Sequence, residues 1–175
     1  MPKKRVEDPL ARLELKPDQL LELKRLAEFY RNEAEKCRSA GAFLAGCIMM
    51  GAYLETLLTL TVYADRKNVA SFGNGPNKDL LDWGLSDLMK VAEKLNWIPR
   101  QIAPEREIFP DDTTTLGSLA ILIQDYRNLV HPGNYCKNAP LAAPLEEDFS
   151  TLVQILWETA SNILVRPRTE LDLGG

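Results

Sequence analysis

Apolar residues recur at helical spacing along the chain, with polar residues at the positions between them. The first such stretch begins near Pro17 and Asp18 and runs toward Ser39, with apolar residues at Leu20, Leu21, Leu23, Leu26, Phe29 and Tyr30. Proline and an acid suit the first turn of a helix, where backbone N–H groups lack helical partners and the dipole favours negative charge. We expect the other face of this helix to be solvated, because it carries Glu22, Lys24, Arg25, Glu28, Arg31, Glu33, Glu35 and Lys36.

The next stretch, from Ala42 to Ala64, is apolar almost throughout and is interrupted by Glu55. A membrane span needs about 20 apolar residues, and a carboxylate near its middle costs on the order of 3 kcal/mol. Because the sequence shows no second span and no aromatic belt, we favour a buried central helix and expect no membrane association. Gly46 and Gly51 offer small surfaces for close helix packing.

Glu55 is a carboxylate on this largely apolar helix. Burial of an unpaired charge is costly, so we expect the side chain to be partnered, protonated or at a water-filled cleft, and Arg127 is the candidate partner. The alternative is that Glu55 faces solvent on a thin polar side of the helix with Thr56 and Thr59. The sequence leaves both interpretations open.

The remaining chain also alternates between turn-rich and helical stretches. Residues 66–79 and 99–112 predict loops, since both are rich in turn-forming residues. Helices are expected from Ser86 and Asp87 to about Asn96 and Trp97, with Leu88, Met89, Val91, Ala92 and Leu95 as the buried stripe, then over residues 113–131 and 146–166. No stretch alternates as a strand would. The predicted class is therefore all-α, an up-and-down bundle of four main helices plus short helices.

The composition fits a single domain. The chain has 175 residues, of which 45% are hydrophobic and 26% charged, and we expect a flexible arm over residues 1–15, the helical domain over 16–167 and a tail over 168–175. The net charge of −4 argues against general polyanion binding, so any contact with nucleic acid should be local.

The cysteines and the histidine restrict the chemistry further. Cys37, Cys47 and Cys136 form no CxxC pair, and no secretion signal opens the sequence, which is typical of reduced cysteines in a cytoplasmic protein. With a single histidine there is no zinc-type spacing, and we expect neither a metal nor another cofactor.

That single histidine, His131, lies in the stretch from Gln124 to Gly133. Arg127 and His131 stand four residues apart and so share one helix face. Because Pro132 disfavours helical conformation at His131, the imidazole should lie at the helix end, where the terminal carbonyls favour its charged form. Arg127, Asn128 and His131 therefore converge at one helix terminus, although Arg and Asn at such a position commonly act only as caps.

Three segments taken together resemble the HEPN-like superfamily of helical-bundle proteins. They are residues 44–58, residues 85–89 and residues 125–133, and the resemblance covers roughly residues 20–165. Many members of that family are metal-independent ribonucleases of toxin or defence systems, and others are non-catalytic partner-binding or nucleotide-binding modules. The resemblance implies that Arg127, Asn128 and His131 fill the positions of the family motif. Fewer residues separate Arg127 from His131 than is usual in the family.

These residue types suit RNA cleavage without a metal. A histidine can transfer protons near neutral pH, and an arginine can hold two phosphate oxygens at once. Asn128 would orient the phosphate or the imidazole, while Tyr126 would either stack on a base or belong to the core. Because each chain has one histidine, a two-histidine mechanism requires a homodimer, which the resemblance also implies.

Two functional hypotheses follow. The first is a dimeric metal-independent endoribonuclease of toxin or defence type, with RNA as substrate and an antitoxin as protein partner. The second is a non-catalytic HEPN-like module that binds a protein or a nucleotide, with Arg127 held structurally by Glu55. Only the site can separate the two, since a fold does not determine a function.

Overall fold

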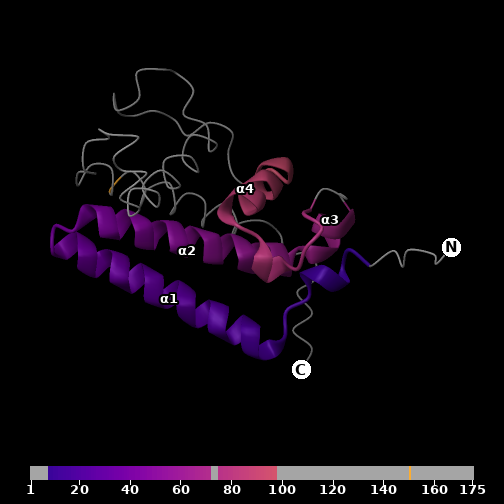
Figure 1. Ribbon diagram of the computed structural model, residues 1–175, viewed down its shortest axis with the longest axis horizontal. Coiled ribbons are helices and arrows are strands. Elements are labelled where there is room, and N and C mark those ends of the chain that lie inside the picture. The colour runs from indigo at the N-terminus through magenta and orange to yellow at the C-terminus, as the bar shows by residue number, and fades with distance from the viewer. Residues whose placement is uncertain (1–7, 72–74, 98–149, 151–175) are drawn as a thin grey trace, which may run out of the picture.

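The computed structural model describes residues 8–71, 75–97 and 150. Within these residues the chain forms helices and turns and no strand, which confirms the all-α class for the described part. Two long helices, α1 (Pro17–Ser39) and α2 (Phe43–Ala64), form an antiparallel hairpin (Figure 1). Their bounds agree closely with the predicted helices. The expected helices over 113–131 and 146–166 lie outside the described residues, apart from Ser150.

The turn between α1 and α2 depends on Gly41. Its φ of 69° lies in the left-handed region, which a residue without Cβ adopts at no steric cost. The backbone N–H groups of Gly41 and Ala42 donate to the carbonyls of Arg38 and Cys37 at 2.9 and 2.8 Å. These bonds satisfy carbonyls at the end of α1 and reverse the chain within three residues.

Helix α1 packs on α2 through a narrow seam of small and half-buried residues. Ala27 and Ala34 are buried, and Leu20, Leu23, Tyr30 and Cys37 continue the same three- and four-residue spacing as half-buried neighbours. Two residues of the predicted apolar face lie off this seam, and the expectation is wrong for them: Leu21 is 70% exposed and Phe29 is 52% exposed. Each is adjacent in sequence to a seam residue and is therefore rotated about 100° away from it.

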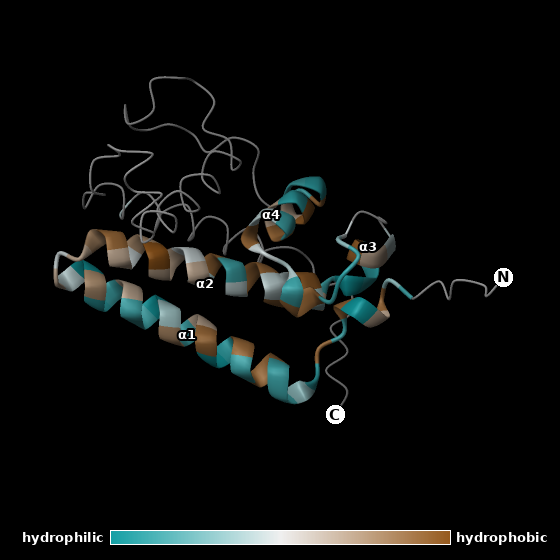
Figure 2. Ribbon diagram, viewed as in Figure 1, coloured by the Kyte–Doolittle hydropathy of each residue, from teal (hydrophilic) through white to brown (hydrophobic). Residues whose placement is uncertain are grey.

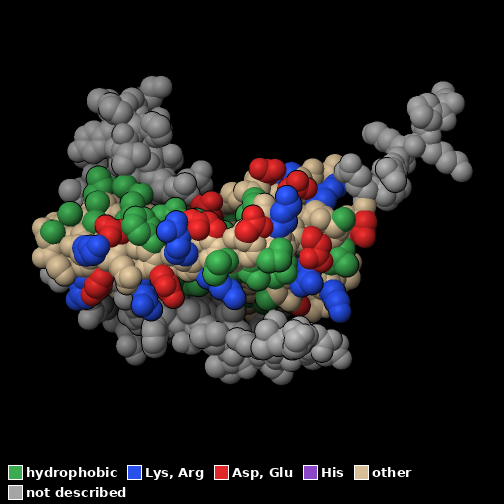
Figure 3. All heavy atoms as spheres, turned by 90° about the horizontal axis from the view of Figure 1, so that it is seen from below, with side chains coloured by type: hydrophobic (Ala, Val, Ile, Leu, Met, Phe, Trp, Pro, Cys, Tyr) green, Lys and Arg blue, Asp and Glu red, His purple; other side chains and the backbone are tan. Residues whose placement is uncertain are grey.

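The charged face of α1 is solvated as predicted. Three ion pairs span one turn each on this helix, between Glu22 and Arg25, between Glu33 and Lys36, and between Glu35 and Arg38. In Figure 3, Lys and Arg side chains alternate with Asp and Glu along the face seen from below, with hydrophobic side chains between them. Exposed pairs of this kind add solubility and little stability.

Helix α2 is the centre of the described fold. It contacts α1 on one side and α4 (Leu85–Lys94) on the other, and most of its residues are hydrophobic (Figures 1 and 2). The side chains of Leu54, Leu58 and Val62 are at most 1% exposed. Among the described helices α2 alone is long and apolar enough to cross a membrane, and 44% of its most apolar stretch is buried within the protein.

Helix α4 begins one residue before the predicted start and buries the predicted stripe as far as Ala92, whereas Leu95 is half-buried. Leu88 and Ala92 are fully enclosed, and Met89 and Val91 are nearly so. The helix ends at Lys94, two to three residues before the predicted end; beyond it Asn96 has a φ of 52°, and the Trp97 N–H donates to the Ala92 carbonyl at 2.9 Å. This closing turn places Trp97, which is 3% exposed, in the core.

The loop prediction for residues 66–79 is wrong over its first half. Residues Arg66–Ser71 form α3, which follows α2 directly. The Asn68 side chain donates to Asp65 Oδ1 at 2.6 Å, and Val69 is buried in the core. Turn-forming residues cluster only after Ser71, so burial of Val69 decides the conformation before them. A short 3-10 helix, η2 (Leu80–Asp82), then leads to α4.

The expected arm is also wrong in its second half. A 3-10 helix, η1 (Ala11–Leu13), places Leu13 and Leu15 in the core at 3% and 8% exposure. Glu14 is paired with Arg66 at 2.7 Å, and the Arg66 guanidinium lies 4.7 Å from the centre of the Tyr63 ring. Two buried leucines and one ion pair thus hold this segment against the end of α2. Residues 1–7 lie outside the described part.

We expect the ion pair at the start of α4 to give the fold a measurable acid sensitivity. Lys78 Nζ lies 2.8 Å from Asp87 Oδ2, and this hydrogen bond and charge hold the pKa of Asp87 below its usual range. A lowered pKa in the folded state stabilises the protein above the unfolded pKa of about 3.9, and this stabilisation disappears as pH falls through the folded value. Because Lys78 is 40% exposed, the effect is limited to about 1 kcal/mol.

The measurement is urea unfolding of wild type and Asp87→Asn between pH 7 and pH 2.5. The wild type should be more stable at pH 7, and the difference should vanish at the acid end. Asp82→Asn, which removes an exposed carboxylate from η2, controls for the change in net charge. A difference between wild type and Asp87→Asn that does not change with pH would contradict the assignment.

Candidate functional site

Glu55 is the one predicted site residue that the structure places. Tyr126, Arg127, Asn128 and His131 lie outside the described residues, so the predicted contact between Glu55 and Arg127 stays a prediction. Glu55 lies near the middle of α2, directly after the fully buried Leu54. Its side chain is half-buried and has an interaction within the protein.

The threonines beside Glu55 do not form a solvated stripe. Thr56 and Thr59 are 7% and 6% exposed, so the alternative in which they face water together with Glu55 is wrong for both of them. Their hydroxyls donate to the carbonyls of Ala52 and Glu55, each at 2.8 Å. A threonine hydroxyl that bonds to the carbonyl four residues earlier needs no water, and this permits its burial within the helix.

Glu55 therefore lies among residues that otherwise exclude water. A carboxylate in such a position can accept hydrogen bonds from both arms of a guanidinium and orient it. Loss of the partner of such a carboxylate would also lower the stability of the fold, because a partly desolvated charge without compensation is destabilising. The described structure thus places one carboxylate of the predicted site on the central helix.

The described residues provide no metal site. Within residues 8–71 and 75–97, no group of three or more His, Cys, Asp and Glu side chains is placed to hold a metal ion. Cys47 is buried in the core, and Cys37 is half-buried on the seam of α1.

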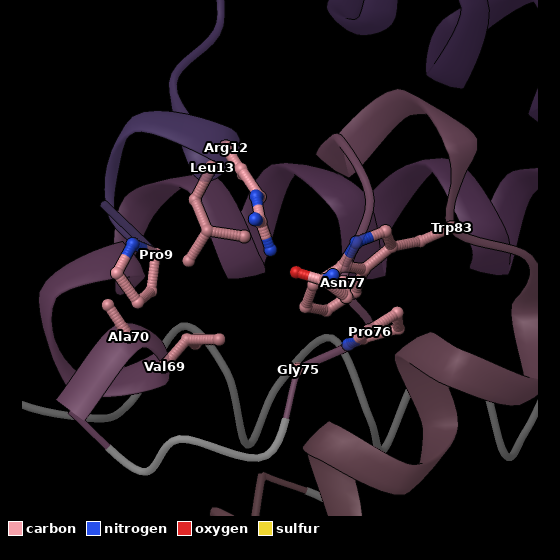
Figure 4. Close-up of a pocket in the computed structure, with 9 residues that line it drawn as sticks. All are labelled: Pro9, Arg12, Leu13, Val69, Ala70, Gly75, Pro76, Asn77 and Trp83. Atoms are coloured by element: carbon pink, nitrogen blue, oxygen red, sulfur yellow. The ribbon is translucent and has the colours of Figure 1, made fainter. Parts of the chain in front are cut away.

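A second candidate site was not predicted from the sequence. It is a cavity of about 280 Å³ at the junction of η1, α3 and the segment before α4 (Figure 4). Its lining residues are Pro9, Arg12, Leu13, Val69, Ala70, Gly75, Pro76, Asn77 and Trp83. No sequence signal identifies it, since its walls come from a segment expected to be a solvated arm and from a stretch expected to be a loop.

Comparison with known proteins assigns neither site. A scan against models of known protein families, a search of curated proteins and a search of solved structures each found no match to this chain. Function must therefore be argued from the residues themselves.

Proposed function

We propose that the chain is a HEPN-like helical domain that acts as a dimeric, metal-independent endoribonuclease of toxin or defence type. The observation that carries the proposal is the motif of Arg127, Asn128 and His131 at a predicted helix end. Two other segments of the resemblance add support, because residues 44–58 lie in α2, residues 85–89 lie in α4, and these two helices pack together.

The proposed chemistry divides between the motif residues. Arg127 binds the phosphate and stabilises the charge that develops on it, and His131 transfers protons to or from the ribose hydroxyl and the leaving oxygen. Asn128 orients the phosphate. One chain offers a single imidazole, so the acid and the base come from two copies of His131 across a two-fold interface. A cytoplasmic location and an antitoxin partner belong to the same proposal.

The half-burial of Glu55 favours a second candidate function, a non-catalytic module that binds a protein or a nucleotide. A half-buried carboxylate on a largely apolar helix suits a structural pair with Arg127. In that case Arg127 serves the stability of the fold and is not available to a phosphate. The two functions therefore make opposite predictions for the loss of Arg127.

We expect the purified protein to cleave single-stranded or structured RNA in EDTA, and His131→Ala to lose at least about 100-fold in rate, as is usual when a general acid or base is removed. The measurement is cleavage of an RNA panel by wild type and variant prepared identically. Arg25→Ala, which removes an exposed arginine from α1, is the matched surface control and should cleave as wild type does. Intact RNA with a folded, dimeric wild-type protein would overturn the ribonuclease proposal.

The requirement for two histidines predicts how activity responds to mixing. When wild type is allowed to exchange subunits with an equal amount of His131→Ala, random pairing leaves about a quarter of the dimers with two histidines. Activity should therefore fall to about half of that of the same quantity of wild type alone, because the mixed dimers are inactive. Unchanged activity per wild-type chain, with exchange verified by mass spectrometry, would show that each chain acts independently.

A double-mutant cycle of Glu55→Gln and Arg127→Gln separates the two candidate functions. The ribonuclease proposal predicts that Arg127→Gln abolishes cleavage and shifts Tm by less than about 2 °C, a change worth a fraction of 1 kcal/mol. The binding module instead predicts destabilisation by Arg127→Gln and a coupling of about 0.5 to 3 kcal/mol between the two positions.

Glu22 and Arg25, an exposed ion pair at 2.8 Å on α1, provide the reference cycle for a weakly coupled pair of the same residue types. If the Arg127→Gln variant keeps both its activity and its Tm, both candidate functions are contradicted.

A further inference from the structure

The cavity between η1, α3 and Trp83 has the features of a small-ligand site. Its lining is mainly apolar, from Pro9, Leu13, Val69, Ala70, Pro76 and Trp83. Ligand pockets are typically concave and apolar, with a few polar groups that fix orientation. At about 280 Å³ the cavity is at the small end of that range, so it suits a ligand on the order of ten non-hydrogen atoms.

Three of the residues that line the cavity belong to the hydrophobic core of the protein. Leu13, Val69 and Trp83 are 3%, 3% and 4% exposed and belong to the hydrophobic core. The Trp83 indole N–H donates to the Lys78 carbonyl at 3.1 Å, which fixes the ring. A site with fixed walls loses little conformational entropy when it binds a ligand.

Gly75 brings the backbone against the edge of this indole. A Cβ at that position would lie 2.9 Å from the nearest ring carbon of Trp83, closer than real Cβ contacts. Absence of a side chain therefore lets the segment 75–77 lie directly beside the ring. This close approach forms one wall of the cavity and places Asn77 at its side.

Two polar side chains converge on the cavity from opposite walls. Figure 4 shows the Arg12 guanidinium, from η1, and the Asn77 carboxamide, from the segment before α4, directed toward one another across the space. Arg12 is half-buried and has an interaction within the protein, which helps to hold it in place. A guanidinium has five N–H donors in a planar fork, so an existing partner leaves donors for a carboxylate.

The segment that carries Arg12 is anchored on both sides. Leu13 and Leu15 pack into the core, and the neighbouring Glu14 is paired with Arg66 at 2.7 Å. The carboxylate of Glu14, two residues after Arg12, is therefore engaged by Arg66. The positive charge of Arg12 is thus presented beside an apolar cavity by a backbone that is held in place.

We propose that this cavity binds an apolar carboxylate, with the hydrocarbon part against Leu13, Val69 and Trp83 and the carboxylate on Arg12 and Asn77. A carboxylate can accept hydrogen bonds from the Arg12 donors that its existing interaction leaves, whereas a phosphate ester of a sugar would leave the apolar walls without contacts. The same chemistry is offered by a free aromatic acid and by the terminal residue of a peptide that ends in an apolar side chain. The proposal is argued from Arg12, Asn77 and the apolar lining and uses none of the motif residues, so it stands independently of the ribonuclease proposal.

Titration of the full-length protein with phenylacetate, followed by the NMR signal of the Trp83 indole N–H, tests the site. Phenylacetate should bind with a Kd on the order of 1 mM or tighter, given the affinity expected for a ligand of ten heavy atoms. Phenylacetamide, which has the same shape without the charge, should bind at least about tenfold more weakly. Tripeptides that end in Phe, with a free or an amidated terminus, distinguish the two sources of the carboxylate.

Two variants test the assigned contacts. Arg12→Gln removes the cation and should weaken phenylacetate at least about tenfold, whereas Ala70→Leu fills part of the cavity and should prevent binding. Arg25→Gln on the outer face of α1 is the matched control and should bind as wild type does. Thermal melting of each variant shows that it is folded.

Tighter binding of the free acid assigns the site to a small metabolite, and tighter binding of the free-terminus peptide assigns it to a chain end. The proposal is overturned if neither binds, if acid and amide bind equally, or if folded Ala70→Leu binds as wild type does.

Discussion

Burial of α2 is the constraint on which the described structure depends. This helix is hydrophobic on almost every side, and a helix of that kind is stable only when other elements cover it. Helix α1 covers one side through Ala27 and Ala34, whose small side chains permit close approach, and α4 covers another side with Leu88 and Ala92. Elements that look marginal in the sequence, such as η1 and α3, fold because they close the same core at the end of α2.

The polar residues of α2 must satisfy the same constraint. Thr56, Thr59 and Thr61 do so within the helix, because each hydroxyl donates to the carbonyl four residues earlier. A carboxylate has no such local solution, since it only accepts hydrogen bonds and the helical N–H groups around it are already engaged. Glu55 is half-buried, so its carboxylate differs from the threonines in needing hydrogen-bond donors that its own helix turn does not supply, either from another side chain or from water.

The sequence was sufficient to locate a helix where the hydrophobic periodicity and the signals for helix ends agreed. Pro17 and Ser39 bound α1 as predicted, and the stripe from Leu88 to Ala92 identified α4. Prediction failed where long-range burial decided the outcome. Val69 and Leu13 lie in short stretches of mixed apolar and polar residues without clear helical periodicity, and only the fold shows that both belong to the core. Prediction failed for Leu21 and Phe29 for a similar reason. Their apolar side chains suggested that they face α2, but the smaller Ala27 and Ala34 are the buried residues of that contact.

The two candidate sites differ in how they could have been recognised and in what they can influence. Arg127, Asn128 and His131 form a local motif, so sequence alone suggests their chemistry, whereas Arg12 and Asn77 converge only through the fold.

Glu55 precedes the end of α2 by nine residues, about 14 Å along the helix axis, and the cavity lies beyond that end. A ligand on the order of ten atoms bound at Arg12 is too short to reach Glu55, so any influence between the sites must pass through the packing of α2 itself. Leu58 and Val62, which lie between them on α2, are fully enclosed, so any such influence would be carried through a closely packed core of low compressibility.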